Sequence, residues 1–271
     1  MKYMISILMA EMRKSHLNHY HNKLIYFSLL IWPALLFVTA YYSFKPFNLT
    51  QSSPLARFIE IEHLSLFLLT GYLGYIFFWC LIQSAWQMSY ERMSGTLELI
   101  FLTPASRIAV MYGRAAGNLV EAVWLFSLFS LLAVFVIGKS HEIIWWNVPI
   151  VMVVLTISAV IWGGFLNVIF LFSRDAGILF TVLEEPMQFF SGVRLPVATF
   201  PLWGKGIAYI FPLTYVLSIV RELLMGRVEW FQLIKPLGML AGILLVLLFF
   251  TFLLLSKAEN HAKETGNMTL Y

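Results

Sequence analysis

The sequence predicts an all-α membrane protein with six transmembrane helices, and two observations support that prediction. Hydrophobic residues make up 60% of the 271 positions and charged residues 12%, against about 45–50% and 25% in ordinary globular domains. A soluble fold of this length is too small to enclose so much apolar surface. Apolar runs long enough to cross a bilayer, which takes about 20 helical residues, recur along the chain. A soluble enzyme, a disordered chain and a nucleic-acid-binding module are therefore excluded.

The predicted spans differ in length and polarity. Five apolar runs qualify readily: 24–44, 63–90, 113–138, 148–172 and 231–256. The sixth, 176–192, carries Glu184 and Glu185 and is expected to be interrupted at Pro186, because proline removes a helical hydrogen bond. At about 1.5 Å per residue this range extends over only ~25 Å, so it either crosses a thin region of the bilayer or stops short.

Residues 193–230 are expected to form an external, partly re-entrant segment before the last span. Prolines and glycines break this range into short pieces: Pro196, Pro201, Gly204, Gly206 and Pro212. Irregular backbone of this kind is tolerated at membrane depth where protein covers it. The alternative is that 207–226 is a full crossing, which would place the C-terminal tail outside the cell.

The distribution of basic residues predicts the orientation. With the N-terminus in the cytoplasm, the cytoplasmic segments hold more lysines and arginines than the first two external loops, as the positive-inside rule requires. Residues 1–23 carry apolar side chains at helical spacing, among them Leu8 and Met12, which predicts an amphipathic helix in the plane of the lipid headgroups. The tail, 257–271, is then cytoplasmic. We expect a multi-pass protein of a bacterial cell membrane, in contact with lipid.

The segment between the second and third spans has the chemistry of a docking helix. Gly95 is expected to end the preceding helix, and the hydroxyl of Thr96 can cap a new one. Apolar side chains dominate residues 96–102, and Thr103 followed by Pro104 ends that short helix and starts another. An apolar helix between charged flanks usually marks a docking surface. The alternative is that it folds back into the headgroups.

Two stretches of the chain resemble the ABC type-2 permeases, the membrane subunits of ATP-binding-cassette exporters. The coupling segment of that family resembles Glu91-Arg92-x-x-Gly95-Thr96-Leu97-Glu98-Leu99 followed by Thr103-Pro104-x-Ser106-Arg107. The family's motif after the fifth span resembles Phe190-Ser191-Gly192-Val193-Arg194-Leu195-Pro196 followed by Phe211-Pro212-Leu213-Thr214-Tyr215. The match extends over nearly the whole chain in order and spacing.

The resemblance implies a set of partners. The permease would pair with a second copy or a paralogue and with two cassette ATPase subunits, which would hold ATP and Mg²⁺. Helix 96–102 would sit in a cleft of the ATPase, with charged side chains at its rim. The expected coupling residues are Glu91, Arg92, Gly95, Thr96, Leu97, Glu98, Leu99, Phe101, Thr103, Pro104 and Arg107. The chain has no Gly-x-x-x-x-Gly-Lys-Ser/Thr loop, so we expect it to bind no ATP by that route and not to be an enzyme itself. We also expect no cofactor, metal or nucleic-acid partner for this chain.

Four polar residues within the apolar spans are candidates for a substrate path: Glu184, Glu185, Gln188 and Asn167. An ionised acid at bilayer depth costs at least ~2.5–3.5 kcal/mol, so the two glutamates should face protein or water. They could contact a cationic or polar substrate, pair with Arg194 or a neighbouring helix, or lie near the outer headgroups. Asn167 and Gln188 could serve only to bond helices together.

The residues and the resemblance together predict a permease subunit of an ATP-driven exporter. It would move a lipid-like, drug-like or glycan substrate out of the cytoplasm by alternating access, coupled to a separate ATPase. The alternative is an ion- or proton-coupled secondary transporter that uses Glu184 and Glu185, since buried acids can relay protons. That class often shows broken helices in both halves of the chain, whereas here only the second half contains such breaks.

Overall fold

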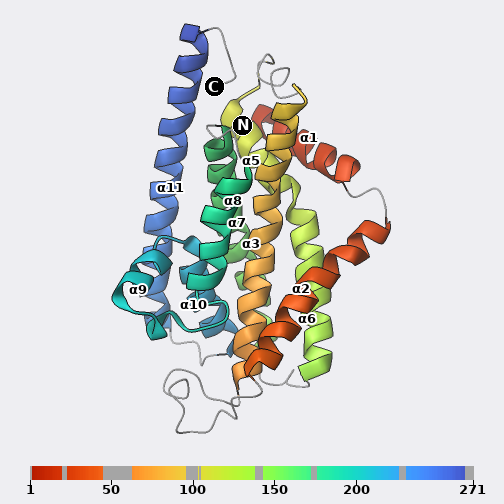
Figure 1. Cartoon of the computed structure of the whole chain (residues 1–271), viewed down its shortest axis with the longest axis vertical. Helices are drawn as coiled ribbons and strands as arrows, with labels where there is room; N and C mark the ends of the chain where they lie inside the picture. The colour runs from red at the N-terminus through yellow and green to blue at the C-terminus, as the bar shows by residue number, and fades with distance from the viewer. Residues whose placement is uncertain are drawn as a thin grey trace.

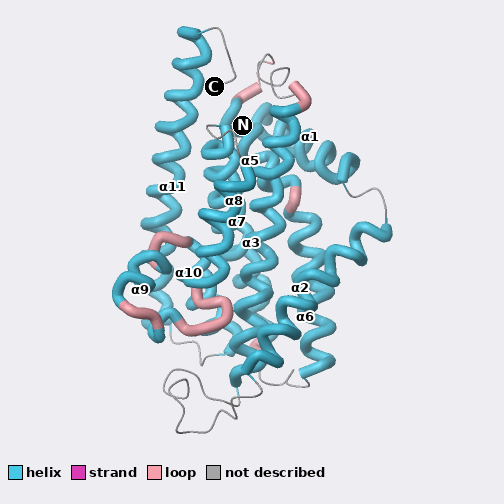
Figure 2. The backbone as a smooth tube through the Cα atoms, in the orientation of Figure 1, coloured by secondary structure: helices cyan, strands magenta, loops and turns pink. Residues whose placement is uncertain are grey.

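The computed structural model describes residues 2–19, 23–44, 63–95, 103, 105–137, 143–171, 176–225 and 230–265. Within these ranges every regular element is a helix (Figure 2), which confirms the all-α class. The predicted coupling helix 96–102 lies outside the described residues, as do Pro104 and residues 266–271 of the predicted tail.

The centre of the molecule is helix α3 (Leu64–Met93). It packs against several helices (Figure 1), among them α2 (Lys23–Phe44), α6 (Leu119–Ile137) and α7 (Val148–Leu171). In the apolar stretch of α3, 89% of the residues are buried within the chain, against 17% in that of α2. A helix that is apolar on all sides belongs in a core, and α3 takes that place. α2 keeps most of its surface for lipid or a partner.

The predicted third span consists of two helices instead of one. α5 (Arg107–Gly117) begins ahead of the predicted start at residue 113, and Asn118 separates it from α6. The backbone N–H of Asn118 donates to the Ala115 carbonyl oxygen, and its side-chain Nδ2 donates to the Cys80 carbonyl oxygen at 2.9 Å. Because a buried amide needs hydrogen-bond partners, Asn118 fixes this turn against α3.

Four helices of the described part are long and apolar enough to cross a membrane: Phe27–Phe44, Leu64–Met88, Trp145–Phe170 and Phe231–Lys257. The third includes the short helix η5 (Trp145–Asn147), and the fourth belongs to α11 (Trp230–Thr265). α8 (Ala176–Phe190) has 15 residues, fewer than the roughly 20 that a crossing needs. The count of six spans therefore stays a prediction.

The prediction that Pro186 interrupts the fifth helix is wrong. Pro186 lies inside α8, which continues to Phe190 and is followed by a turn in which Gly192 has a φ of +88°. A proline removes one hydrogen bond of a helix, and neighbouring elements can compensate for that loss. α8 has such neighbours, because it packs against α3 and α9 (Leu202–Ala208). The turn that follows α8 contains Gly192 in the left-handed conformation, which glycine adopts without steric cost.

Residues 193–225 form three short helices: η6 (Val197–Thr199), α9 and α10 (Pro212–Met225). α9 and α10 are bent by 87° at the break between them. Pro212 begins α10, a position that suits proline because the first helical N–H has no partner in the helix. The apolar face of α10 is buried against α3, α7 and α11. The re-entrant segment and the full crossing both stay predictions for 207–226, and a full crossing would contain this bend.

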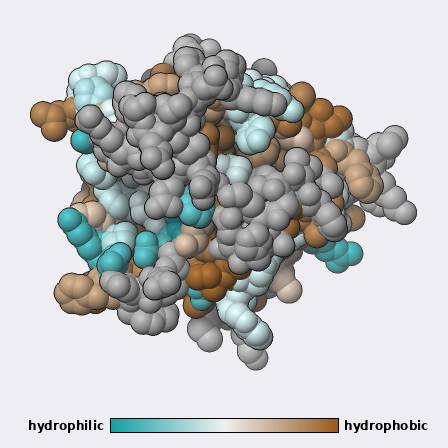
Figure 3. All heavy atoms as spheres, turned by 90° about the horizontal axis from the view of Figure 1, so that it is seen from below, coloured by the Kyte–Doolittle hydropathy of each residue, from teal (hydrophilic) through white to brown (hydrophobic). Residues whose placement is uncertain are grey.

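The two ends of the bundle differ. α1 (Lys2–His19), α5 and the C-terminal end of α11 lie at one end, and α9 and α10 lie toward the other (Figure 1). Figure 3 looks onto this second end, where hydrophilic and apolar side chains are mixed. Large apolar side chains are exposed in the elements near it: Trp146, Leu202, Trp203 and Phe231. Exposed aromatic side chains at the end of a bundle are typical of the boundary between lipid and water.

Candidate functional site

The end of the bundle that leads into the predicted coupling segment carries four charged side chains: Glu11, Lys14, Glu91 and Arg114. The first two come from α1, Glu91 from the last turn of α3 and Arg114 from α5. Lys14 Nζ lies 2.6 Å from Glu91 Oε1, and Arg114 donates a hydrogen bond to the other oxygen of that carboxylate. Glu11 Oε2 lies 3.8 Å from Lys14 Nζ and from Arg114 Nε. This charge cluster joins the three helices.

Close packing shields most of the charge cluster from water. Gly113 lets α1 approach the backbone of α5, since a Cβ there would lie 3.3 Å from Glu11 Cβ. Arg114 is 5% exposed and Glu91 22%. Burial alone would raise the pKa of Glu91, but the charges and hydrogen bonds of Arg114 and Lys14 lower it more, so that the pKa lies below its usual value. Glu91 is therefore ionised at neutral pH, as an ion pair with either base requires.

The structure shows the flanks of the predicted coupling segment. α3 ends at Met93, and Gly95 has a φ of +73°, a left-handed conformation that glycine adopts without steric cost. Thr103 is exposed, and Arg107 is the first residue of α5. The other predicted coupling residues lie outside the described part of the chain: Thr96, Leu97, Glu98, Leu99, Phe101 and Pro104, together with the side chain of Arg92.

Glu91 has partners within the chain that the sequence did not indicate. The resemblance implies a place at the rim of an ATPase cleft, whereas in the structure the carboxylate bridges α1 and α5. Sequence reasoning missed Glu11, Lys14 and Arg114 as members of one site. The only signal was an arginine near the start of a predicted span, which needs an acid or a headgroup at that depth. Its partner lies 23 residues earlier, and no helical spacing links the two.

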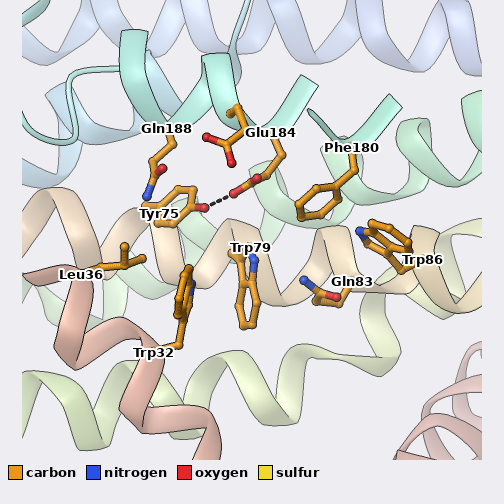
Figure 4. A pocket seen from close by; sticks show the side chains of 10 residues that line it. Trp32, Leu36, Tyr75, Trp79, Gln83, Trp86, Phe180, Glu184 and Gln188 are labelled. Carbon is orange, nitrogen blue, oxygen red and sulfur yellow. Dashed lines mark hydrogen bonds between the residues drawn. The ribbon is translucent and has the colours of Figure 1, made fainter. Parts of the chain in front are cut away.

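A second polar site lies in a cavity of about 340 Å³ between α2, α3 and α8 (Figure 4). α2 and α8 each pack against α3, and the cavity opens between them. Aromatic and polar side chains dominate its lining, which comprises Trp32, Leu36, Tyr75, Trp79, Gln83, Trp86, Phe180, Glu184, Glu185 and Gln188. Such a lining offers both apolar contact and polar groups that can orient a ligand.

Helical spacing brings these side chains together. Tyr75, Trp79 and Gln83 are four residues apart on α3, and Glu184 and Gln188 are four apart on α8. Each set therefore shares one face of its helix. Tyr75 Oη donates a hydrogen bond to the Glu184 carboxylate (Figure 4). The side chain of Glu184 is buried, and a buried acceptor needs such a donor.

Three of the four predicted substrate-path residues lie together, and the fourth lies elsewhere. The three on α8 line the α2–α3–α8 cavity. Asn167 belongs to α7 and is fully buried against α3 and α5. Its Nδ2 donates to Ser84 Oγ and to the Met111 carbonyl oxygen, at 3.0 Å each. Asn167 therefore bonds helices together, which was the alternative role considered for it.

The acids of the cavity differ from those of the charge cluster in their partners. Glu184 bonds to a neighbouring helix through Tyr75. Arg194, the candidate partner from the sequence, contacts Tyr72 instead, with its guanidinium carbon 5.9 Å from the centroid of that ring. Within the described residues, no lysine, arginine or histidine forms an ion pair with Glu184 or Glu185. An ionised acid at bilayer depth costs at least ~2.5–3.5 kcal/mol, and no cationic side chain in the described part of the chain pairs with these two acids to offset that cost.

Arg221 of α10 holds the turn after α8 against α3. Its Nη2 donates to the Gly192 carbonyl oxygen at 2.7 Å and to the Phe67 carbonyl oxygen at 3.2 Å. The guanidinium carbon lies 3.6 Å from the centroid of the Phe67 ring, a cation–π contact. Gly71 lets the turn approach, since a Cβ there would lie 2.2 Å from the Val193 carbonyl oxygen. These contacts fix the C-terminal end of α8 and thereby the position of the acids.

A comparison with models of protein families identifies the family of this chain. The model of the ABC-2 type transporter matches residues 7–225. The chain belongs to the ABC-2 type transporter family. This membership confirms the resemblance seen in the sequence, and the secondary transporter is not the class of this family. No curated protein matches the chain in sequence.

Membership in the family defines the broad role of this ABC-2 permease. The family consists of membrane subunits of ABC transporters, which have no nucleotide-binding site of their own and act with an ABC ATPase. Together with the apolar helices, it makes this chain a multi-pass membrane protein. The matched range includes both the charge cluster and the α2–α3–α8 cavity.

Proposed function

We propose that this permease is the membrane subunit of an ATP-driven exporter and that residues 96–102 couple it to the ATPase. The family match over 7–225 is the observation that supports this proposal most. ATP and Mg²⁺ bind to the partner ATPase, and the permease pairs with a second copy or a paralogue. The substrate, a lipid-like, drug-like or glycan molecule, moves out of the cytoplasm of a bacterial cell.

The arrangement of helices around the coupling segment supports a mechanical role for it. The segment joins the end of α3 to the start of α5, two helices that also share the charge cluster with α1. A displacement of residues 96–102 therefore acts on three connected helices. α3 in turn packs against α2, α6, α7, α8 and α10. A movement at one end of α3 thus reaches most of the bundle, as alternating access requires.

The proposal includes a definite topology. The N-terminus and residues 257–271 lie in the cytoplasm, with residues 1–23 in the plane of the headgroups. Segment 193–230 lies on the external side. The structure supports this topology, because α1 and the C-terminal end of α11 lie at one end of the bundle and α9 and α10 toward the other (Figure 1).

Substituting Leu99 tests the coupling role. Leu99→Asp places a charge in the proposed apolar contact, and an unpaired charge in such a contact costs more than the ~1.4 kcal/mol that corresponds to tenfold binding. The full-length Leu99→Asp protein is purified from membranes with a tag, and the activity of the co-purified ATPase is measured. We expect its vanadate-sensitive ATP hydrolysis to be at least about tenfold lower than that of wild type.

The matched control is Leu99→Met, which keeps the apolar character and should retain the associated ATPase. Membrane insertion of all three proteins is measured in parallel by their yield in the membrane fraction. If Leu99→Asp inserts normally and retains as much ATPase as wild type, residues 96–102 are not the contact and the proposed coupling is wrong.

A further inference from the structure

We infer that the α2–α3–α8 cavity binds a lipophilic organic cation that carries one positive charge and aromatic surface. The inference rests on the proposed transport function, for which it names the substrate class. It is argued from the charge, the lining and the size of the cavity. Each of these features points to the same chemistry.

The cavity has two acids in its lining, Glu184 and Glu185. Glu184 is 5% exposed and accepts a hydrogen bond from Tyr75, which is a neutral donor. Glu185 is the second acid of the lining, and the described residues of the lining include no lysine, arginine or histidine. In the charge cluster at the other site, by contrast, each acid lies beside two bases. When the carboxylate of Glu184 is ionised, it therefore has no charge partner among the described residues, and a bound cation can take that place.

The aromatic lining favours an organic cation over a metal ion. Three tryptophans line the cavity, Trp32 from α2 and Trp79 and Trp86 from α3, and the face of a tryptophan attracts organic cations best among aromatic rings. In Figure 4, Trp32 and Trp79 lie on the α2 side of the cavity, and Glu184 and Gln188 lie on the α8 side. A molecule between them can touch aromatic rings and a carboxylate together.

The donor set is poor for metals. Within the described residues, no group of three or more histidine, cysteine, aspartate or glutamate side chains is placed to hold a metal ion. Hard cations such as Ca²⁺ require six to eight oxygen ligands, and adjacent residues of a helix point about 100° apart. Glu184 and Glu185 therefore do not form a chelating pair. The remaining polar groups, the amides of Gln83 and Gln188, suit hydrogen bonds to an organic molecule.

The size of the cavity limits the ligand. Its volume of about 340 Å³ lies at the lower end of the roughly 300–1,000 Å³ of small-molecule sites. One buried acid, Glu184, and one exposed acid, Glu185, suit a single positive charge inside and solvent at the edge. A compact cation with several aromatic rings meets all of these conditions.

Tetraphenylphosphonium is a probe of this kind, and tetraphenylborate has the same shape with the opposite charge. Binding is measured as saturable uptake of each labelled ion by the full chain in lipid nanodiscs, after subtraction of empty nanodiscs. We expect saturable binding of tetraphenylphosphonium and none of tetraphenylborate. Glu184→Gln, which keeps the shape and an acceptor for Tyr75, should raise the Kd for tetraphenylphosphonium at least about tenfold. Glu222→Gln in α10 removes the same charge outside the cavity and should leave the Kd unchanged.

A second pair of variants keeps both acids in place. Gln188 lies one helical turn after Glu184, so a lysine there supplies an internal cation at the i,i+4 spacing. Gln188→Lys should abolish saturable binding of tetraphenylphosphonium. Gln188→Met also removes the amide but adds no charge, so it should weaken binding far less than Gln188→Lys does. Monodisperse elution and the melting temperature of each variant show whether it is folded, and only folded variants are compared.

The result that overturns the inference is equal binding of the two ions, or wild-type affinity in both Glu184→Gln and Gln188→Lys. These measurements need no ATPase, so they are independent of the Leu99 experiment. Wild-type ATPase association in Leu99→Asp, together with intact cation binding, would contradict the coupling proposal alone. Intact coupling without saturable cation binding would contradict this inference alone.

Discussion

The charge cluster and the α2–α3–α8 cavity both contain two glutamates, but the side chains around these acids differ in charge. In the charge cluster, Glu11 and Glu91 lie beside Lys14 and Arg114, so charges within the chain offset one another. In the cavity, the two acids have tryptophans and glutamines around them and a tyrosine as the hydrogen-bond donor. The first arrangement is complete without a ligand. The second has the sign and the lining of a binding site.

The difference also separates two kinds of role. A buried ion-pair network between helices resists the separation of its parts, because removing one member leaves another buried charge unpaired. Such a network suits the place where a partner pushes on the permease. An acid without a charged partner costs stability at membrane depth, and a cost of that kind is expected where function needs the group free for a ligand.

The largest effect is expected from Arg114→Met. This change leaves Lys14 as the one base that the described ion pairs place beside the carboxylates of Glu11 and Glu91. Because Arg114 is 5% exposed, we expect the free energy of unfolding to fall by about 3–5 kcal/mol. Denaturant unfolding of the purified chain, followed by tryptophan fluorescence, measures it. A loss below about 1 kcal/mol, the range of surface pairs, would show that the charge cluster does not hold the helices together.

A smaller effect is expected in the cavity from Tyr75→Phe. The change removes the hydroxyl that donates to the buried Glu184 carboxylate, and leaving a buried acceptor unsatisfied costs about 1–3 kcal/mol. The same unfolding measurement applies. A double-mutant cycle with Glu184→Leu provides the control, since the Tyr75→Phe change should cost much less when the acid is already absent. Equal costs in both backgrounds would mean that the hydrogen bond contributes nothing.

Acidification tests the charge cluster through Glu91. Its pKa in the folded chain is below its usual value, because the lowering by Arg114 and Lys14 exceeds the raising by burial. The stability from this shift is present above the pKa of the unfolded chain and is lost as the pH falls through the lower, folded pKa. Wild type should therefore lose melting temperature on acidification more steeply than Glu91→Gln. Parallel pH curves for the two proteins would contradict the prediction.

The smallest effect is expected from Lys14→Met. The side chain of Lys14 is 36% exposed, and pairs of that exposure contribute about 0–1 kcal/mol because water and salt screen them. We expect a loss of at most about 1 kcal/mol at low salt, which shrinks further as salt is added. Melting curves at two salt concentrations measure both quantities. A loss as large as that of Arg114→Met would show that exposure does not rank the members of the charge cluster.

The sequence predicted the elements of this fold better than their breaks. Long apolar runs marked α2, α3, α7 and α11, because a span needs many apolar residues in succession and composition alone reveals them. The turn at Asn118 was missed, since only its bond to the Cys80 carbonyl oxygen distinguishes it from a residue inside a helix. The break expected at Pro186 was wrong for a related reason. Whether a proline ends a helix depends on the neighbours that compensate for it.

The site was predicted in the same uneven way. Glu184, Glu185 and Gln188 were found because they are polar residues inside an apolar run. Their partners were not found, because Tyr75 lies 109 positions before Glu184 in the chain. Asn167 shared the polar signal but belongs to a different contact, with Ser84 and Met111. A polar residue at membrane depth needs a hydrogen-bond or charge partner, but the sequence does not show which residue that partner is.

What the sequence by itself determined is the membrane class, the helical fold and the family, because these follow from composition, local spacing and contiguous motifs. What only the tertiary structure decided is which charges meet. Glu91 forms ion pairs with bases on α1 and α5, and Glu184 accepts a hydrogen bond from a tyrosine on α3 in a cavity lined by tryptophans. The physical reason is that electrostatic and hydrogen-bond partners depend on distances of a few ångströms between helices. Packing of the whole bundle sets those distances.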